Sequence, residues 1–172
     1  MKRLLSLLII AVLFTSCSVF NNEDRIVNLE GKRQKLDYSK HRIYVLFSNL
    51  GCHDCHKKLN EYFENNNFYS NDSIEIIGYI GIPNGEIKNL LFRKSSLIFF
   101  NKYYPNIKKV YFSEQNKDRQ ISFLDYKIPD YEVPAIVLIK QDTILFIGIR
   151  DILKYENGRN YNVNEDLLIL MK

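Results

Sequence analysis

Two cysteines, Cys52 and Cys55, stand three residues apart, and their position constrains the chain more than any other feature of the sequence. Residues 42–47, just before them, form a β-branched and aromatic run that predicts a buried strand, and residues 48–51 read as a turn. From Cys52 onward apolar residues recur at helical intervals as far as the asparagines at 65–67. The pair is therefore predicted at the start of a helix that follows a buried strand. There the two sulfurs are close enough to bond, and the helix N-terminus favours a thiolate on Cys52.

The other apolar runs predict one α/β domain around a mixed sheet, because helices and strands alternate first and a hairpin and a helix close the chain. Residues 113–130 are polar and predicted to be rich in turns. Further strands are expected at 73–80, 109–112, 133–139 and 143–147, the last two as an antiparallel hairpin, and further helices at 86–104 and 164–171. The apolar face expected for the first of these helices is Ile87, Leu90, Leu91, Leu97 and Ile98.

This order of elements resembles the thioredoxin-like family. A Cys-x-x-Cys pair at a strand–helix junction is typical of it, and Val133–Pro134 ahead of an apolar strand matches the family's cis-proline, which faces the dithiol and helps to bind the substrate chain. The resemblance covers residues 30–172. It implies that Cys52 is the nucleophile, that Cys55 is the resolving thiol, and that Val133 and Pro134 bind substrate.

The same resemblance implies the fold and the reaction. The expected fold is a three-layer α/β/α sandwich with a central mixed sheet. The 79 positions from Cys55 to Pro134 fit the larger TlpA/ResA-like or AhpC/TSA-like branch, with an extra αβ insertion at residues 85–112. The expected activity is thiol–disulfide exchange with client proteins that carry thiols or disulfides, and with a separate redox partner. No cofactor or metal is implied.

Several residues depart from the family pattern. Gly51 replaces the usual aromatic residue before the first cysteine, and Leu46 stands where a buried acid is expected, which leaves no obvious proton acceptor for Cys55. Asp54 opposes a thiolate at the helix start, whereas His53 and His56 favour it if they are protonated. These three residues are therefore predicted to modulate the pair.

Three other interpretations of the cysteine pair stay open at this point. Cys52-x-x-Cys55-His56 also satisfies the attachment signature of c-type haem, with His56 as the iron ligand. The two cysteines and a histidine are also possible metal ligands. In the third interpretation the disulfide is only structural, and the chain is a binding or assembly protein.

Residues 1–16 read as a secretory signal peptide, with Lys2 and Arg3 ahead of an apolar run that is too short to span a membrane. Thr15-Ser16-Cys17 at its end resembles a bacterial lipobox. In that class of signals the cysteine becomes the new N-terminus and carries acyl chains such as palmitate. The expected product is a lipid-anchored protein of a bacterial cell envelope, with a tether at 17–29 and the domain facing the periplasm.

The charge balance excludes one class of partner. The whole chain carries 24 basic and 20 acidic residues, a net charge of +4. Without Lys2 and Arg3, 22 basic residues face 20 acidic ones. A balance this close to neutral provides no basic surface for nucleic acid.

Overall fold

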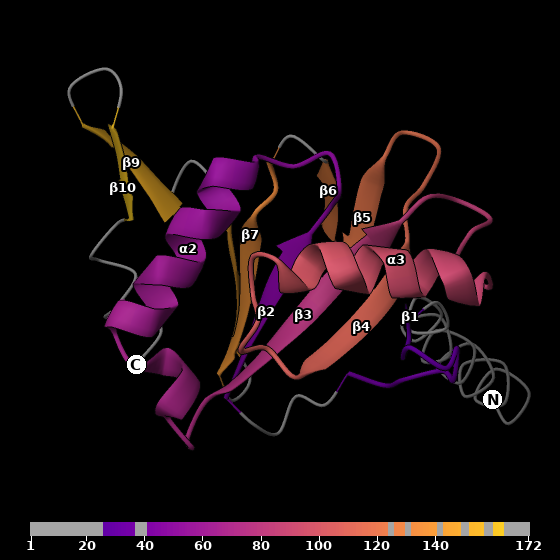
Figure 1. Ribbon diagram of the computed structural model, residues 1–172, viewed down its shortest axis with the longest axis horizontal. Helices are drawn as coiled ribbons and strands as arrows, with labels where there is room; N and C mark the ends of the chain where they lie inside the picture. Colours follow the sequence, from indigo (N-terminus) through magenta and orange to yellow (C-terminus); the bar gives the residue numbers. More distant parts are fainter. Residues whose placement is uncertain are drawn as a thin grey trace, which may run out of the picture.

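The computed structural model describes residues 26–36, 41–123, 126–129, 132–140, 143–148, 152–156 and 160–163. Within these ranges the protein is a mixed α/β structure with two α-helices beside a six-stranded sheet of order β1-β4-β3-β2-β7-β8 (Figure 1). The strands of this sheet are β1 (Ile26–Val27), β2 (Arg42–Phe47), β3 (Glu75–Ile82), β4 (Lys109–Glu114), β7 (Ala135–Lys140) and β8 (Thr143–Ile147). The helices are α2 (His53–Asn65), the 3-10 turn η2 (Phe68–Ser70) and α3 (Leu90–Asn101).

The two helices cover the same face of this sheet, as Figure 1 shows. β2 pairs in parallel with β3, and β3 pairs in parallel with β4, so the chain steps across the sheet in one direction. Because each β-α-β crossover is right-handed, two steps in the same direction place both helices on one side. β7 and β8 add an antiparallel hairpin at the other edge of β2, which makes the sheet mixed.

Alternate residues of β2 build two cores, one on each face of the sheet. Ile43, Val45 and Phe47 pack on the helical side, whereas Tyr44 and Leu46 belong to the core of the opposite side. All six residues of β2 are buried, because both faces of a central strand are covered. The opposite face is covered in part by a second hairpin, β5 (Gln120–Phe123) and β6 (Tyr126–Pro129), whose Ile121, Phe123 and Ile128 complete that core.

The β5–β6 hairpin corrects the prediction that residues 113–130 are turn-rich. Alternating burial along β5 explains why the segment pairs, since Ile121 and Phe123 point inward and their neighbours lie partly exposed. A further hairpin, β9 (Leu153–Glu156) and β10 (Asn160–Val163), was not predicted and lies beside α2. The helix expected at 164–171 lies outside the described residues, so the described part contains one helical layer.

The predicted apolar face of α3 is wrong, although the helix itself is present. Arg93, Ser96 and Phe100 are the buried residues of α3, while Leu91 and Ile98 are exposed. Arg93 turns inward because its guanidinium donates to two backbone carbonyls, those of Leu29 (2.9 Å) and Ile87. Together α3 and β4 form the αβ unit that was expected at residues 85–112.

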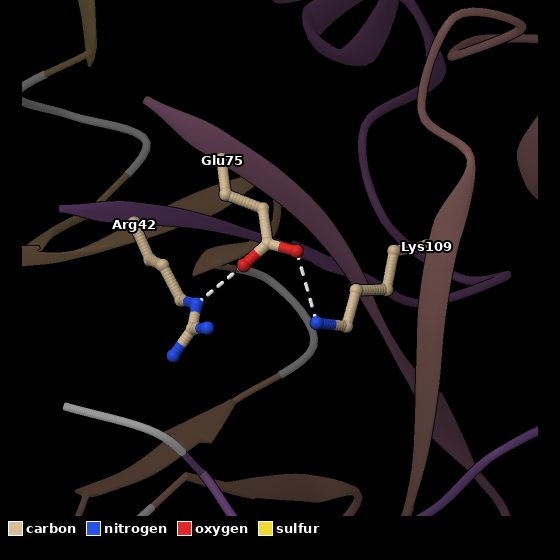
Figure 2. A network of polar contacts seen from close by, with 3 residues as sticks. All are labelled: Arg42, Glu75 and Lys109. Atoms are coloured by element: carbon tan, nitrogen blue, oxygen red, sulfur yellow. Dashed lines mark hydrogen bonds and ion pairs between the residues drawn. The ribbon is translucent and has the colours of Figure 1, made fainter. Parts of the chain in front are cut away.

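A polar network joins the first residues of the three parallel strands (Figure 2). Glu75 accepts hydrogen bonds from Arg42 Nε (2.5 Å) and Lys109 Nζ (2.9 Å). Burial alone raises the pKa of Glu75, but these two cationic donors overcome it and hold the pKa below its usual value. The network lies at the amino ends of the strands, so the loop that follows β2 emerges at the opposite edge of the sheet.

Candidate functional site

A disulfide between Cys52 and Cys55 stands at the carboxyl end of β2, where α2 begins. Cys52 is the N-cap residue of α2 and is exposed, whereas Cys55 lies in the first turn and is 4% exposed. The two Cα atoms are 5.2 Å apart, within the ordinary range for a disulfide. The structure thus confirms the predicted pairing and the predicted order of exposure. One sulfur can meet a reagent in solution, and the other is shielded by the core.

The start of α2 is suited to negative charge on Cys52. No side chain caps α2. The N–H groups of its first turn therefore place the positive end of the helix dipole at the cysteine pair. Asp54 is the acidic residue in this turn, and it is exposed, which lets solvent screen its charge. The helix N-terminus therefore favours a thiolate on Cys52, and solvent weakens the opposing charge of Asp54.

The Val133–Pro134 segment lies directly against the cysteine pair, although 80 positions separate it from the helix start. The Cys52 amide donates to the Val133 carbonyl at 3.2 Å. The Val133–Pro134 peptide bond is cis, as the resemblance predicts, and both side chains are buried. β7 begins at the next residue and pairs with β2, and this pairing brings the two segments together.

Gly51 lies in a closely packed part of this loop. A Cβ atom there would lie 3.1 Å from the Val133 carbonyl oxygen, 3.2 Å from His56 Nε2 and 3.3 Å from the Ser48 carbonyl oxygen. All three distances are shorter than ordinary van der Waals contact, and two of the atoms belong to backbone that already accepts hydrogen bonds. A larger side chain at this position would have to shift these neighbours.

His53 and His56, which the sequence analysis grouped together, lie in opposite environments. His53 is exposed, with its Nε2 3.4 Å from the Asn49 carbonyl and its ring against Phe99 and Tyr103. His56 is fully buried, with its Nδ1 2.8 Å from the Tyr104 hydroxyl.

Burial, with a smaller contribution from the charge of His53, lowers the pKa of His56 to about 3. The imidazole of His56 is therefore neutral at physiological pH. The condition under which His56 would support the thiolate by its charge, a protonated ring, is therefore not met. Burial also raises the pKa of Tyr104 well above its usual value, so its hydroxyl keeps its proton.

Apolar side chains reach solvent close to the disulfide. Leu50, two residues before Cys52, is exposed. Beside it the outer face of α3 forms an open hollow of about 350 Å³, lined by Asn49, Ser95, Ile98, Phe99 and Lys102. A polypeptide that approaches Cys52 therefore meets a mixed surface, in which Leu50, Ile98 and Phe99 are the apolar residues.

Two residues that hold the site in place by hydrogen bonds, Ser48 and Tyr104, were not predicted from the sequence. Ser48 is buried, and its hydroxyl accepts from the Leu50 amide (3.3 Å) and from Gln115 Nε2 (3.5 Å). Tyr104 comes from the turn after α3 and has no sequence feature that connects it with His56. Ser48 belongs to the predicted turn at 48–51 and Tyr104 precedes Pro105, but neither position identifies a partner.

This geometry gives no support to the c-type haem and metal-binding interpretations of the cysteine pair. The described residues hold no group of three histidine, cysteine, aspartate or glutamate side chains that could bind a metal ion. His56 is enclosed by aromatic rings and bonded to Tyr104, so its ring does not face a surface where haem could dock. Cys17 lies outside the described residues. No helix in the described ranges has the length and apolar character to cross a membrane.

Comparison of the chain with protein-family models, with curated proteins and with solved structures found no match to any of them. The fold and the site by themselves define a mixed α/β protein with a disulfide at a strand–helix junction.

Proposed function

We propose that this chain is a thioredoxin-like thiol–disulfide oxidoreductase that works through Cys52 and Cys55. The observation that carries the proposal is the unequal exposure of two bonded sulfurs at a helix N-terminus. An exposed sulfur that is stabilised as a thiolate can attack a disulfide, and a shielded sulfur three residues away can then displace the product. The contact of Cys52 with Val133 gives further support, because the family places a substrate-binding segment there.

The proposed reaction conserves atoms and electrons. The Cys52 thiolate attacks a sulfur of the substrate disulfide, forms a mixed disulfide and releases one substrate thiolate. Cys55 then loses its proton to solvent and attacks the Cys52 sulfur, which restores the Cys52–Cys55 disulfide and releases the second substrate thiolate. The substrate gains two electrons and the protein loses two. A separate redox partner with two thiols would return the two electrons by the same exchange, and its own sulfurs would become a disulfide.

The proposed clients are proteins that carry thiols or disulfides. The exposed Leu50 and the hollow that contains Ile98 and Phe99 provide apolar contacts among polar side chains near the cysteine pair, which suit an unfolded or flexible polypeptide. We also propose that the signal peptide directs the chain to a bacterial cell envelope, and that acylation of Cys17 anchors it to a membrane.

Glutathione disulfide gives a direct test on the reduced full-length protein, with Cys17→Ser in every variant so that only the pair can react. Cys55→Ser is expected to accumulate a glutathione adduct on Cys52, visible by mass spectrometry, because attack occurs and resolution does not. The unaltered pair is expected to react equally fast without accumulating an adduct. Cys52→Ser, the matched control, is expected to react at least about tenfold more slowly, because Cys55 is shielded. Equal adduct formation by both single variants would contradict the proposal.

A further inference from the structure

The hydrogen bond between the buried side chains of His56 and Tyr104 indicates which nitrogen of the His56 ring carries the proton. Nδ1 is the sole hydrogen-bond partner of the Tyr104 hydroxyl among the described residues, and Nε2 has no partner there. If the hydroxyl donates to Nδ1, the ring proton sits on Nε2 and only that N–H lacks a partner. The opposite tautomer leaves both the hydroxyl proton and the Nε2 lone pair without partners. Because a buried polar group without a partner is costly, we assign the proton to Nε2.

The unpartnered Nε2 lies at the start of α2, beside the loop that leads into Cys52. The His56 amide donates to the Cys52 carbonyl at 3.1 Å, so the two residues are one helical turn apart. Side chains four positions apart share a helix face, and each leans toward the helix N-terminus. Accordingly Nε2 lies next to Gly51, the residue directly before Cys52. Phe47, Tyr103 and Tyr104 enclose the other sides of the ring.

We propose that His56, held by Tyr104, donates a hydrogen bond from Nε2 to the Cys52 sulfur in the reduced protein and thereby stabilises its thiolate. This inference rests on the proposed exchange function. In the disulfide state both sulfurs are bonded to each other, and the N–H lacks a strong acceptor. After reduction the Cys52 thiolate is a charged acceptor, and hydrogen bonds to charged groups are the stronger ones.

The titration of Cys52 depends on every ionisable group near this ring. These groups are Asp54 and Cys55 in the first turn of α2, His53 on the solvent side, and Tyr103 and Tyr104 from the turn after α3. His56 keeps its proton on Nε2 throughout the reaction. Reduction by two molecules of glutathione gives one glutathione disulfide, the Cys52 thiolate and the Cys55 thiol, and one proton goes to water.

The test is the equilibrium constant of the full-length protein with a glutathione redox buffer. His56→Phe keeps an aromatic ring in the core but removes both ring nitrogens. We expect the constant for reduction to fall at least about tenfold, which is about 30 mV toward a more reducing couple. The Cys52 thiol pKa, measured from the pH dependence of alkylation, is expected to rise by about one unit.

Tyr104→Phe provides a second variant in case His56→Phe does not fold. It frees the ring to carry its proton on Nδ1, and we expect a fall of at least about threefold in the same constant, because this tautomer has no N–H toward Cys52. Tyr79→Phe is the matched control, since it loses an equivalent hydroxyl bond, to the Ser122 carbonyl at 2.8 Å, on the other face of the sheet. Its constant is expected to stay within about twofold of the unaltered protein.

Two outcomes overturn the inference, and they are distinguishable. If the unaltered protein exchanges with glutathione but His56→Phe and Tyr104→Phe match the Tyr79→Phe control, the inference fails and the proposed function stands. If the unaltered protein shows no exchange with glutathione at all, both fail.

Discussion

Replacement of Glu75 by glutamine tests the network at the amino ends of the parallel strands (Figure 2). The Arg42 side chain is 5% exposed, whereas Glu75 and Lys109 are 35% and 41% exposed. A hydrogen bond to a charged group contributes about 1.5–3 kcal/mol to stability, and an exposed ion pair about 0.2–1 kcal/mol. Solvent screening at Glu75 reduces the first figure, so we expect Glu75→Gln to cost about 1–2 kcal/mol. Lys109→Met should cost less than about 1 kcal/mol.

Urea unfolding of the oxidised protein measures these costs, with Glu61→Gln as the control. Glu61 pairs with Lys57 at 3.9 Å on the exposed surface of α2, and its replacement should change stability by less than about 0.5 kcal/mol. The pH dependence provides a second check. Because the pKa of Glu75 is lowered in the folded state, its contribution is present above the unfolded pKa of about 4.3 and is lost as the pH falls through the folded pKa.

Two results would refute the reasoning about Glu75. The first is a Glu75→Gln protein as stable at pH 7 as the Glu61→Gln control. The second is a difference from the unaltered protein that stays the same size as the pH is lowered well below 4, where the carboxyl group of the unaltered protein gains its proton.

The remaining predictions concern the site and the N-terminus. Gly51→Ala should lower stability by about 1 kcal/mol in urea unfolding, because the added methyl overpacks the loop, and should slow exchange with glutathione disulfide; unchanged values of both would refute the packing argument. A brief pulse of alkylating agent on the reduced protein should label Cys52 before Cys55, as measured by mass spectrometry of the peptides. Labelling of Cys55 first would contradict the order of exposure of the two cysteines. Cys17→Ser should abolish incorporation of labelled fatty acid and release the chain from membranes, and membrane association that persists in this variant would exclude the lipid anchor.

The central strands were predictable because each is a continuous apolar run. The predicted bounds of β2 and β8 agree with the structure, and those of β3, β4 and β7 agree within two residues. Both faces of such strands are covered, so the apolar signal does not depend on knowing the partner. The start of α2 at the cysteine pair was predictable for a related reason, since a turn and a change of apolar period mark the boundary.

The elements that were missed depend on contacts between distant residues. β5 has only Ile121 and Phe123 as its inward pair, and the rings that contact Phe123, those of Tyr44 and Tyr79, come from other strands. The orientation of α3 is set by Arg93, whose burial follows from carbonyl groups outside the helix, so its apolar residues indicated the wrong face. The spacing of apolar residues along β5 and α3 does not reveal either contact.

In the candidate site, too, some features were predictable from the sequence and others depend on contacts between distant residues. The cysteine pair and Val133–Pro134 were predictable from spacing and from a family resemblance, and the structure brings them together. The state of His56 was not predictable, because it depends on burial against Phe47 and on the Tyr104 hydroxyl, which comes from the turn after α3. The sequence alone does not show whether a histidine next to a cysteine pair faces water or the core.

The reduction potential of the Cys52–Cys55 couple tests the proposed function most directly. It is measured on the full-length protein by equilibration in thiol–disulfide buffers of known potential, with alkylation to count the free thiols. Structural disulfides have potentials below about −300 mV. A couple that exchanges with client proteins is expected to lie above this value, within the range of working dithiols. A potential below about −300 mV would contradict the account and indicate that the disulfide serves only to stabilise the start of α2.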